Sequence, residues 1–484
     1  MSKSKNMNNR NVAVEIDSLS FAYAGAHKSI DDISFRVPQG ECHVLMGASG
    51  SGKTTIIRCI NGLAGGYWAG ASQGIIRING IDARQLAAWE RAEYVGSVFQ
   101  DPASQFFSAQ LAGEIAFGCE NLGFSHEDVV SKVDTLIRNM ELENLRGRKI
   151  DTLSSGEKQK TAIASALAPS PKILVMDEPS ANLDENAARE LGQTLKRLKE
   201  QGVTLLIAEH RIGYLMDVAD SFHYVHEGRK VCTMRPDDVR RLTQSERLEM
   251  GIRTSDMTKN MEEVVQHKSS VDGASGHNVE LKASHVTVRI DKDDIVCDAS
   301  LDLCSGNITA IIGENGVGKT TFMRALAGLV KTQSGSICID GRNVKPRHLR
   351  KKVWYSPNDL SAQFFTASVA EEVMLQVIPT EDNVEKAREL LKKLGLYEYK
   401  ESHPYALSGG QKQRLAVVCA LMQERKVIIF DEPTSGLDAI NMLRLSDALT
   451  LAAQNGAAIA VVTHDSDFIE ACCTHAYVMN KKAK

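Results

Sequence analysis

The stretch GASGSGKTT, residues Gly47–Thr55, decides the fold, because it joins the short apolar run Val44–Met46 to a helical pattern that follows. Glycines at this spacing let successive backbone N–H groups converge on phosphate oxygens. The following helix aims the positive end of its dipole at the same charge. Lys53 would reach the β- and γ-phosphates of a nucleotide, and Thr54 would bind a magnesium ion. A chance glycine-rich turn before a helix is the alternative.

The same motif recurs as GENGVGKTT at Gly313–Thr321, after the apolar run Ile308–Ile312. One chance match in a chain of this length is uncommon, and a second after an equivalent apolar run favours a phosphate-binding loop in each half. The candidate nucleotide-binding residues of the two loops are Gly47, Ala48, Ser49, Gly50, Ser51, Gly52, Lys53, Thr54 and Thr55, then Gly313, Glu314, Asn315, Gly316, Val317, Gly318, Lys319, Thr320 and Thr321.

Length and composition indicate a protein of several domains without an obvious nucleic-acid partner. The 484 residues suggest about two to three domains, and 57 basic against 61 acidic side chains give a net charge of −4. This balance offers no bulk attraction to nucleic acid. The polar start MSKSKNMNNR lacks a signal-peptide core, and no stretch has the roughly 18 apolar residues of a membrane span. We therefore expect a cytosolic protein, or one held at a membrane by partners.

The repeat divides the chain into two similar domains. Alternating patterns predict strands at 12–23 and 30–37, and again at 286–290 and 296–303. The segments VGSVFQDPASQFF and VWYSPNDLSAQFF also correspond, as a duplicated domain with small deletions would explain. We place the first domain at residues 1–230 and the second at 279–484. The linker, 231–278, has a Ser/Gly-rich end and one predicted short helix within 236–250.

Two further apolar runs, ILVMDEPSANLD and VIIFDEPTSGLD, each end in an Asp-Glu pair. Runs of this kind suit central parallel strands, and the carboxyl ends of such strands meet the phosphate loop of a neighbouring strand. Asp177 and Asp431 would hold magnesium there, largely through water. Glu178 and Glu432 would polarise the attacking water as general bases. A solvated acidic pair at a strand end is the alternative, and its duplication after two phosphate loops counts against it.

Two more motifs recur in both halves. His210 and His464 each lie 32 residues after the paired glutamate and follow an apolar strand, so we interpret them as γ-phosphate sensors rather than structural histidines. LSSGEKQK and LSGGQKQR each open an Ala-rich helix, where an N-cap hydroxyl and free amides make a second anion site. The residues of these two sites are Ser154, Ser155, Gly156 and Glu157, and Ser408, Gly409, Gly410 and Gln411.

In this order the motifs resemble the nucleotide-binding domain of ATP-binding cassette (ABC) proteins, over nearly the whole chain except the linker and termini. The resemblance implies an α/β fold with two tandem P-loop NTPase domains. Each would have a mostly parallel sheet core, an antiparallel β subdomain and a helical subdomain. It also implies an ATPase that uses ATP and Mg²⁺. The motifs match Walker A, Walker B, signature and switch-histidine elements, and Tyr23 matches the aromatic side chain that stacks on adenine.

The segment Val98–Gly123 looks like the ATPases of energy-coupling factor (ECF) transporters, which import vitamins and metal ions. Gln100 matches the Q-loop glutamine that senses magnesium. The resemblance implies a transmembrane coupling subunit and a small substrate-binding membrane subunit as partners, at the cytoplasmic face of the cell membrane. Coupling helices would dock near Gln100–Phe107 and Asn358–Phe365, although core packing is the alternative role for the phenylalanines. A tandem ABC ATPase of the ribosome and the ATPase of a sugar importer are the competing functions. The sequence does not specify the transported substrate.

In this family two cassettes pair head to tail, so each ATP lies between Walker A of one and the signature of the other. We expect the two domains of this chain to pair in this way. Three departures then fall in the site built on the second Walker A: Ser155 replaces a glycine, Asn358 a glutamine and Arg289 an aromatic side chain that could still stack on adenine. We expect asymmetric sites, with slower turnover at the second. The alternative is that both sites hydrolyse ATP, because Glu432 and His464 are intact.

Overall fold

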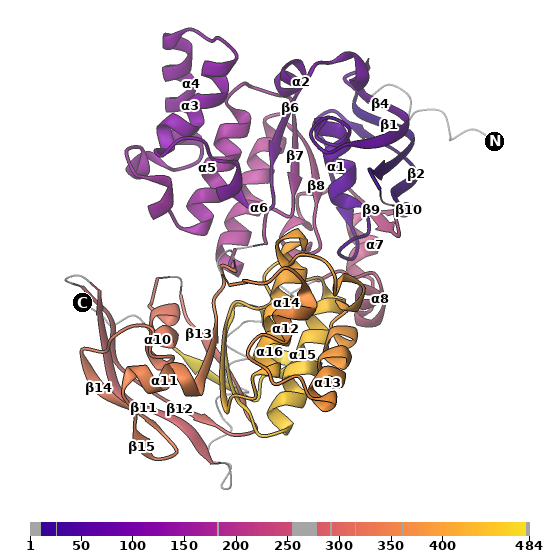
Figure 1. Ribbon diagram of the computed structural model, residues 1–484. Helices are drawn as coiled ribbons and strands as arrows, with labels where there is room; N and C mark the ends of the chain where they lie inside the picture. The colour runs from indigo at the N-terminus through magenta and orange to yellow at the C-terminus, as the bar shows by residue number, and fades with distance from the viewer. Residues whose placement is uncertain are drawn as a thin grey trace. The chain divides into compact units, whose positions relative to one another are not determined.

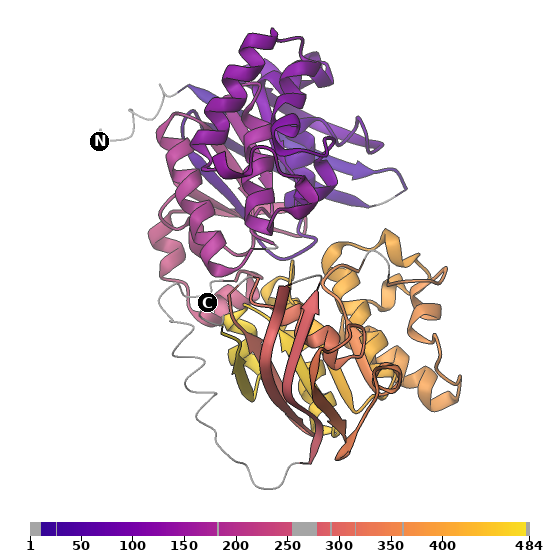
Figure 2. The same ribbon diagram turned by 90° about the vertical axis from the view of Figure 1, so that its left-hand side faces the viewer.

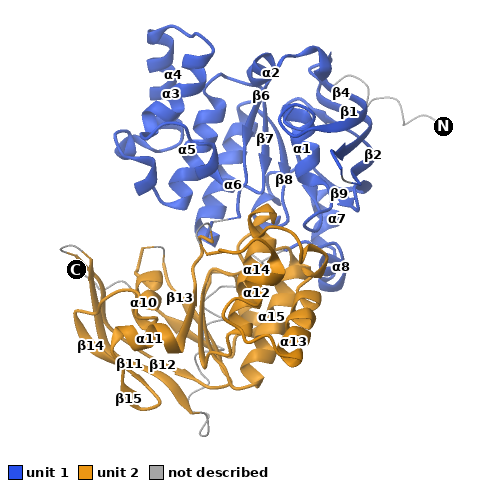
Figure 3. Ribbon diagram, viewed as in Figure 1, with its two compact units in different colours: residues 1–254 blue, residues 255–484 orange. Residues whose placement is uncertain are grey.

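The computed structural model describes residues 11–25, 27–181, 183–253, 278–290, 293–314, 316–360 and 363–480. They form two compact units, residues 1–254 and 255–484 (Figure 3). The first unit includes residues 231–253, which the sequence analysis placed in the linker, because they form a strand and two short helices there. The predicted phosphate-loop residue Asn315 lies outside the described residues.

The first unit is built on a six-stranded sheet of order β10-β9-β3-β8-β7-β6, in which only β10 runs antiparallel to its neighbour. Its strands are β3 (Cys42–Met46), β6 (Val95–Val98), β7 (Ile173–Asp177), β8 (Thr204–Ala208), β9 (Ser221–His226) and β10 (Arg229–Met234). β3, β7 and β8 are buried on both faces, as their continuous apolar runs require. Leu174 and Met176 of β7 join one core, and Ile173 and Val175 join the other.

A second, antiparallel sheet of order β2-β1-β4-β5 covers one face of the central sheet together with α1. In Figure 1 it lies on the opposite side of β6–β8 from the helices α3, α4 and α5. Its strands are β1 (Val12–Tyr23), β2 (Lys28–Pro38), β4 (Gly70–Ile78) and β5 (Ile81–Asp82). The helices of the unit are α1 (Lys53–Asn61), α2 (Ala88–Tyr94), α3 (Leu111–Asn121), α4 (His126–Asn139), α5 (Ser155–Leu167), α6 (Glu185–Glu200), α7 (Pro236–Arg240) and α8 (Gln244–Glu249).

The second unit repeats this plan with a five-stranded, wholly parallel sheet of order β16-β17-β18-β13-β19. These strands are β13 (Ile308–Ile312), β16 (Val353–Ser356), β17 (Val427–Asp431), β18 (Ala458–Val462) and β19 (His475–Val478). The antiparallel sheet, of order β12-β11-β14-β15, consists of β11 (Val279–Ile290), β12 (Asp293–Cys304), β14 (Ser334–Ile339) and β15 (Arg342–Asn343).

Helices cover the sheet of the second unit as they do in the first (Figure 2). They are α10 (Lys319–Leu326), α11 (Pro346–Lys352), α12 (Val369–Val373), α13 (Glu381–Lys393), α14 (Gly409–Met422), α15 (Ala439–Gln454) and α16 (Ser466–Cys472). The predicted α/β fold, with a parallel sheet, an antiparallel sheet and a helical part in each half, is confirmed. Among the described residues, no helix has both the length and the apolar character that crossing a bilayer requires.

Candidate functional site

The phosphate loop of the first unit connects the end of β3 to the start of α1. Lys53 Nζ donates to the carbonyl oxygens of Gly47 and Ala48, at 2.7 and 2.8 Å, and so closes the loop on itself. Gly47 has φ 148°. A Cβ at Gly47 would lie 2.2 Å from the carbonyl oxygen of Val225, so only glycine fits between the loop and β9. Gly52 caps α1 without a side-chain hydrogen bond in the described part, which leaves first-turn N–H groups for an anion.

The second unit builds the same loop between β13 and α10. Lys319 Nζ donates to the carbonyl oxygens of Gly313 and Glu314, at 2.7 and 3.0 Å. A Cβ at Gly313 would lie 2.4 Å from the carbonyl oxygen of Met479, directly after β19. The close approach of Gly47 to β9 is thus repeated in the second unit. Both loops therefore have the backbone shape that the two glycine-rich motifs predict.

Buried polar atoms without partners mark where a ligand would complete the first site. Within the described part of the chain, Ser51 Oγ and both ring nitrogens of His210 have no hydrogen-bond partner, although both residues are buried. Such groups cost stability unless a ligand or water satisfies them. The γ-phosphate of a nucleotide on the loop would supply acceptors to a serine hydroxyl and an imidazole N–H. The residues present thus fit ATP.

The acidic pair of the first unit lies at the end of β7, beside the phosphate loop. Thr54 Oγ1 donates to Asp177 Oδ1 at 2.9 Å, and Gln100 Nε2 donates to Glu178 Oε2 at 2.8 Å. His210 Nδ1 lies 3.6 Å from Glu178 Oε1. The five predicted residues therefore lie together.

Burial and charge make the two carboxyls of this pair unequal. Burial, and then repulsion by Glu178, raises the pKa of Asp177 to about 7. Burial opposes ionisation of Glu178 too, but its neighbours His210 and Lys53 outweigh burial and lower its pKa. Opposed shifts in adjacent groups are typical of catalytic pairs. A magnesium ion would favour the charged form of Asp177, and the donor set of one carboxylate and one hydroxyl suits that ion.

In the second unit, Thr320 and Tyr355 both donate hydrogen bonds to the Asp431 carboxylate, Tyr355 from its phenol at 3.0 Å. Burial raises the pKa of Asp431. Burial, and then the Asp431 charge, raises the pKa of Tyr355, so the phenol stays a donor. His464 Nε2 lies 3.7 Å from Glu432 Oε1. The sequence analysis missed Tyr355, and a comparison with Ser97 at the equivalent position could have found it.

Both candidate general bases share one unusual backbone conformation. Glu178 has φ 44° and Glu432 has φ 52°, in the left-handed region that non-glycine residues rarely adopt. The N–H of each glutamate donates to a carbonyl at the end of the adjoining strand, Ala208 in one unit and Val462 in the other. Because this strained backbone conformation recurs at the equivalent glutamate of each unit, it indicates a functional constraint on the glutamate side chain.

A second residue that the sequence analysis missed is Glu209, directly before the predicted switch histidine. Its fully buried carboxylate accepts five hydrogen bonds. Oε1 accepts from the N–H groups of His210 and Arg211, and Oε2 from the N–H and hydroxyl of Ser180 and the hydroxyl of Tyr214. Glu209 thus ties the loop after β7 to the loop after β8. Thr463 stands at the equivalent position of the second unit.

The two candidate signature segments begin α5 and α14. Ser154 and Glu157 form a reciprocal capping box, in which the Ser154 N–H donates to Glu157 Oε2 at 2.7 Å, and Ser408 and Gln411 form the same box. Both serines are exposed. Each serine hydroxyl accepts from the amide of its own helix and keeps its proton for an outside acceptor.

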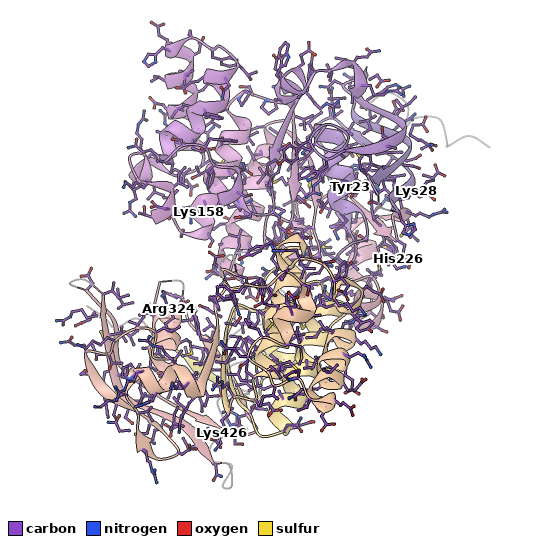
Figure 4. All side chains as sticks on the ribbon, viewed as in Figure 1. Tyr23, Lys28, Lys158, His226, Arg324 and Lys426 are labelled. Atoms are coloured by element: carbon purple, nitrogen blue, oxygen red, sulfur yellow. The ribbon has the colours of Figure 1, made fainter. Side chains whose placement is uncertain are left out.

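The two candidate adenine contacts differ in surroundings. Tyr23, labelled in Figure 4, is half-buried at the end of β1, and its hydroxyl lies 3.4 Å from Thr55 Oγ1. Arg289, in β11, instead donates from Nε and Nη2 to the Asp294 carboxylate, at 2.6 and 3.0 Å. The guanidinium is therefore held by an ion pair across the β11–β12 hairpin.

The Phe-Phe segments of the two halves are held in the same way. Glu114 Oε2 accepts from the N–H groups of Phe107 and Ser108, and Glu372 Oε2 accepts from those of Phe365 and Thr366, all at 2.8–2.9 Å. Both glutamates are buried, whereas Phe107 is 77% and Phe365 is 79% exposed. Of the preceding phenylalanines, Phe364 is buried in the core of the second unit, and Phe106 is partly buried and packs against the core of the first. Core packing thus accounts for the first phenylalanine of each pair, not for the second.

Two regions of the chain, residues 30–181 and 296–435, match the family described as ABC transporter. They contain the phosphate loops, the acidic pairs and the signature segments described above. The chain belongs to the ABC transporter family. As a member, it is an ABC-type ATPase with two tandem ATP-binding domains.

Similar proteins agree with this assignment. A Treponema denticola protein, provisionally named an ABC transporter ATP-binding protein, is 37% identical over 96% of this chain and 95% of its own length. A Bacillus subtilis protein, provisionally named the HMP/thiamine import ATP-binding protein YkoD, is 31% identical over 96% of this chain and 89% of its own length. A structure of ribosome-bound archaeal Pelota and ABCE1 contains a chain with TM-score 0.68 and 21% identity. The match spans 95% of our chain and 76% of the chain in that structure, and at this identity the likeness concerns the fold alone.

Proposed function

We propose that this ABC ATPase is the ATP-hydrolysing subunit of an ECF-type importer, and that it works with separate membrane subunits to take up a vitamin or metal ion. The observation that carries the proposal is the pair of exposed phenylalanines, Phe107 and Phe365, whose backbone N–H groups each donate to a buried glutamate. The ECF-like segment Val98–Gly123 and the import function in the name of the Bacillus subtilis relative support it.

Each residue of the first site has a role in the proposed hydrolysis of ATP. The amides at the start of α1 and the Lys53 ammonium bind phosphate oxygens. Thr54 and Asp177 would hold Mg²⁺, which when bound neutralises charge on the phosphate oxygens. Glu178 Oε2, to which Gln100 now donates, orients the attacking water and accepts its proton. His210 donates a ring N–H to the γ-phosphate.

The exposed phenylalanines are suited to receive a helix of a membrane subunit. Exposing an aromatic ring to water is unfavourable, and burying it against a partner would contribute about 1.5–3 kcal/mol to the free energy of binding. Glu114 and Glu372 fix the backbone beside each ring, so little conformational entropy is lost when a partner docks. Phe107 also stacks on Phe117, with ring centroids 4.9 Å apart, and the two rings extend the apolar surface.

The test is affinity purification of the tagged protein from detergent-solubilised membranes of its own cells. We expect a transmembrane coupling protein and a small membrane protein with bound solute to co-purify. The double variant Phe107→Ala and Phe365→Ala should lose both while retaining ATP binding. Tyr67→Ala is the matched control, because Tyr67 is 79% exposed but lies outside these segments, and it should keep both partners. Ribosomal proteins in place of membrane proteins would refute the importer.

We further infer that the two ATP sites turn over unequally. Gln100 is half-buried and bonded to Glu178, whereas Asn358 is exposed. Glu178→Gln should therefore remove most of the ATPase activity, and Glu432→Gln much less. Equal losses in the two variants would show that the sites are equivalent.

A further inference from the structure

In both units a threonine of the phosphate loop donates to the aspartate of the acidic pair, Thr54 to Asp177 and Thr320 to Asp431, and each unit adds a second anchor from a different element. In the first unit the anchor is Gln100, in the loop after β6, which donates to Glu178 at 2.8 Å. In the second unit the anchor is the phenol of Tyr355, within β16, which donates to Asp431 at 3.0 Å. A side chain on a strand has far less freedom than one in an exposed loop, because the parallel ladder to β17 fixes the strand on one side.

The strand register shows that Tyr355 occupies the position that Ser97 holds in the first unit. Tyr355 lies opposite Ile429 of β17, and Ser97 of β6 lies opposite Val175 of β7. Each is two residues before the register position of the Asp of its unit, so Ser97 and Tyr355 are structural equivalents. Ser97 is too short to span the distance that the tyrosine ring covers. Asp177 accepts from Thr54 as Asp431 accepts from Thr320, so the Tyr355 hydroxyl is a donor in addition to the shared threonine.

We propose that Tyr355 is a positioning residue that orients Asp431 for Mg²⁺ in the second unit. The inference rests on the proposed ATP sites and adds a residue to one of them. Hydrogen bonds to a metal-binding carboxylate fix its orientation, and loss of such a partner lowers metal affinity by roughly 10- to 100-fold.

The loop after β16 carries Asn358 at the position that Gln100 holds in the first unit. Asn358 is exposed and one methylene shorter than glutamine, and its backbone carbonyl accepts from Gln413 Nε2 of α14 at 3.3 Å. Tyr355 is half-buried, and Arg324 of α10 (labelled in Figure 4) also acts on its phenol and on Asp431 through charge. The Tyr355 hydroxyl is thus a contact to the candidate Mg²⁺-binding carboxylate that comes from a strand rather than from this loop.

The experiment measures Mg²⁺-dependent nucleotide binding in each half of the intact chain. A protease recognition sequence is inserted after Gly273, and the full-length protein is photolabelled with radioactive 8-azido-ATP over a range of Mg²⁺ concentrations. Cleavage after labelling separates the halves, so the Mg²⁺ concentration for half-maximal labelling is read for each. In Tyr355→Phe, which removes only the hydroxyl, we expect this value to rise roughly 10-fold in the second half and to stay unchanged in the first.

Gln100→Ala is the matched control and should shift the first half alone. Tyr355→Ser, which installs the residue of the first unit, should act as Tyr355→Phe does and covers the case in which phenylalanine disturbs β16. A second half that keeps its Mg²⁺ requirement in both Tyr355 variants overturns the inference, as does an equal shift in both halves. Absence of Mg²⁺-dependent labelling in the unsubstituted protein would instead refute the ATP sites. The importer proposal is judged separately by co-purification.

Discussion

Glu209→Gln should destabilise the first unit, although the change replaces one carboxylate oxygen by an NH₂ group of almost the same size. The two carboxylate oxygens accept two and three hydrogen bonds, from Ser180, His210, Arg211 and Tyr214. An amide accepts through one oxygen only. If the NH₂ group took the place of Oε1, the backbone N–H groups of His210 and Arg211 would face it in a fully buried place. In the other orientation the Ser180 N–H would face it, whereas the hydroxyls of Ser180 and Tyr214 can turn to accept from it.

The expected loss follows from these contacts. A hydrogen bond to a charged group contributes about 1.5–3 kcal/mol, and the bonds to one carboxylate are not additive. Losing at least one backbone bond, together with the charge that strengthens the others, should cost about 3 kcal/mol, within the range for breaking a buried charged cluster. In a unit of about 250 residues, 1 kcal/mol corresponds to roughly 2–4 °C, so the melting temperature of the first unit should fall by roughly 6–12 °C.

Calorimetry of the full-length protein measures this shift, and Thr463→Ala provides the matched control in the second unit. Thr463 is also fully buried, and its hydroxyl accepts from the N–H of Asp465 at 3.1 Å. Loss of one such neutral bond costs about 1 kcal/mol. The two variants should shift different transitions, and Glu209→Gln should have the larger effect. A shift for Glu209→Gln no larger than that for Thr463→Ala would refute the reasoning.

Three further predictions concern the first unit. Gly251→Ala should raise the ATP concentration that half-saturates the first half several-fold, in the photolabelling assay, because the new Cβ would lie 2.6 Å from Ala48 Cβ and push on the phosphate loop. Burial, and then the His43 charge, lowers the pKa of His223 to about 3. Below pH 6.5 the unfolded chain therefore binds a proton that the folded unit does not. Stability should fall by about 2 kcal/mol between pH 8 and pH 5, as urea unfolding would measure, and less so in His223→Gln. Glu114→Ala should cost about 2 kcal/mol and weaken co-purification of membrane partners, since two backbone N–H groups lose their acceptor.

Sequence patterns located the elements that depend on local chemistry. β1 runs from Val12 to Tyr23, as its alternation predicts, and both phosphate loops follow buried strands. β11 was predicted only from residue 286, but it begins at Val279, because Leu281 and Ala283 are buried in the core and pair with both β12 and β14. The helix predicted within 236–250 is two helices, and Thr243 begins the second with a capping box to Glu246. That T-x-x-E signal was readable in the sequence.

The contacts of Glu209 and Tyr355 could not be predicted, because they depend on how distant segments meet. Glu209 follows an apolar strand and contacts Ser180, 29 residues earlier. Tyr355 is separated from Asp431 by 76 residues, and in VWYS it has the pattern of an ordinary strand aromatic. Only the parallel pairing of β16 with β17 brings its hydroxyl to the carboxylate. Position-by-position comparison of the two halves would have marked both residues, since each replaces one polar group by another.

These exchanges change what the departures in the second half imply. Asn358 alone indicates a site that has lost a magnesium contact, and such a site should bind nucleotide weakly. With Tyr355 bonded to Asp431, the loss in the loop coincides with a new donor on the strand. Glu432 also keeps the left-handed backbone conformation of Glu178, which a site released from function would have no reason to maintain. A site that holds Mg²⁺–ATP while its partner turns over explains both observations, whereas decay of the second site explains only Asn358.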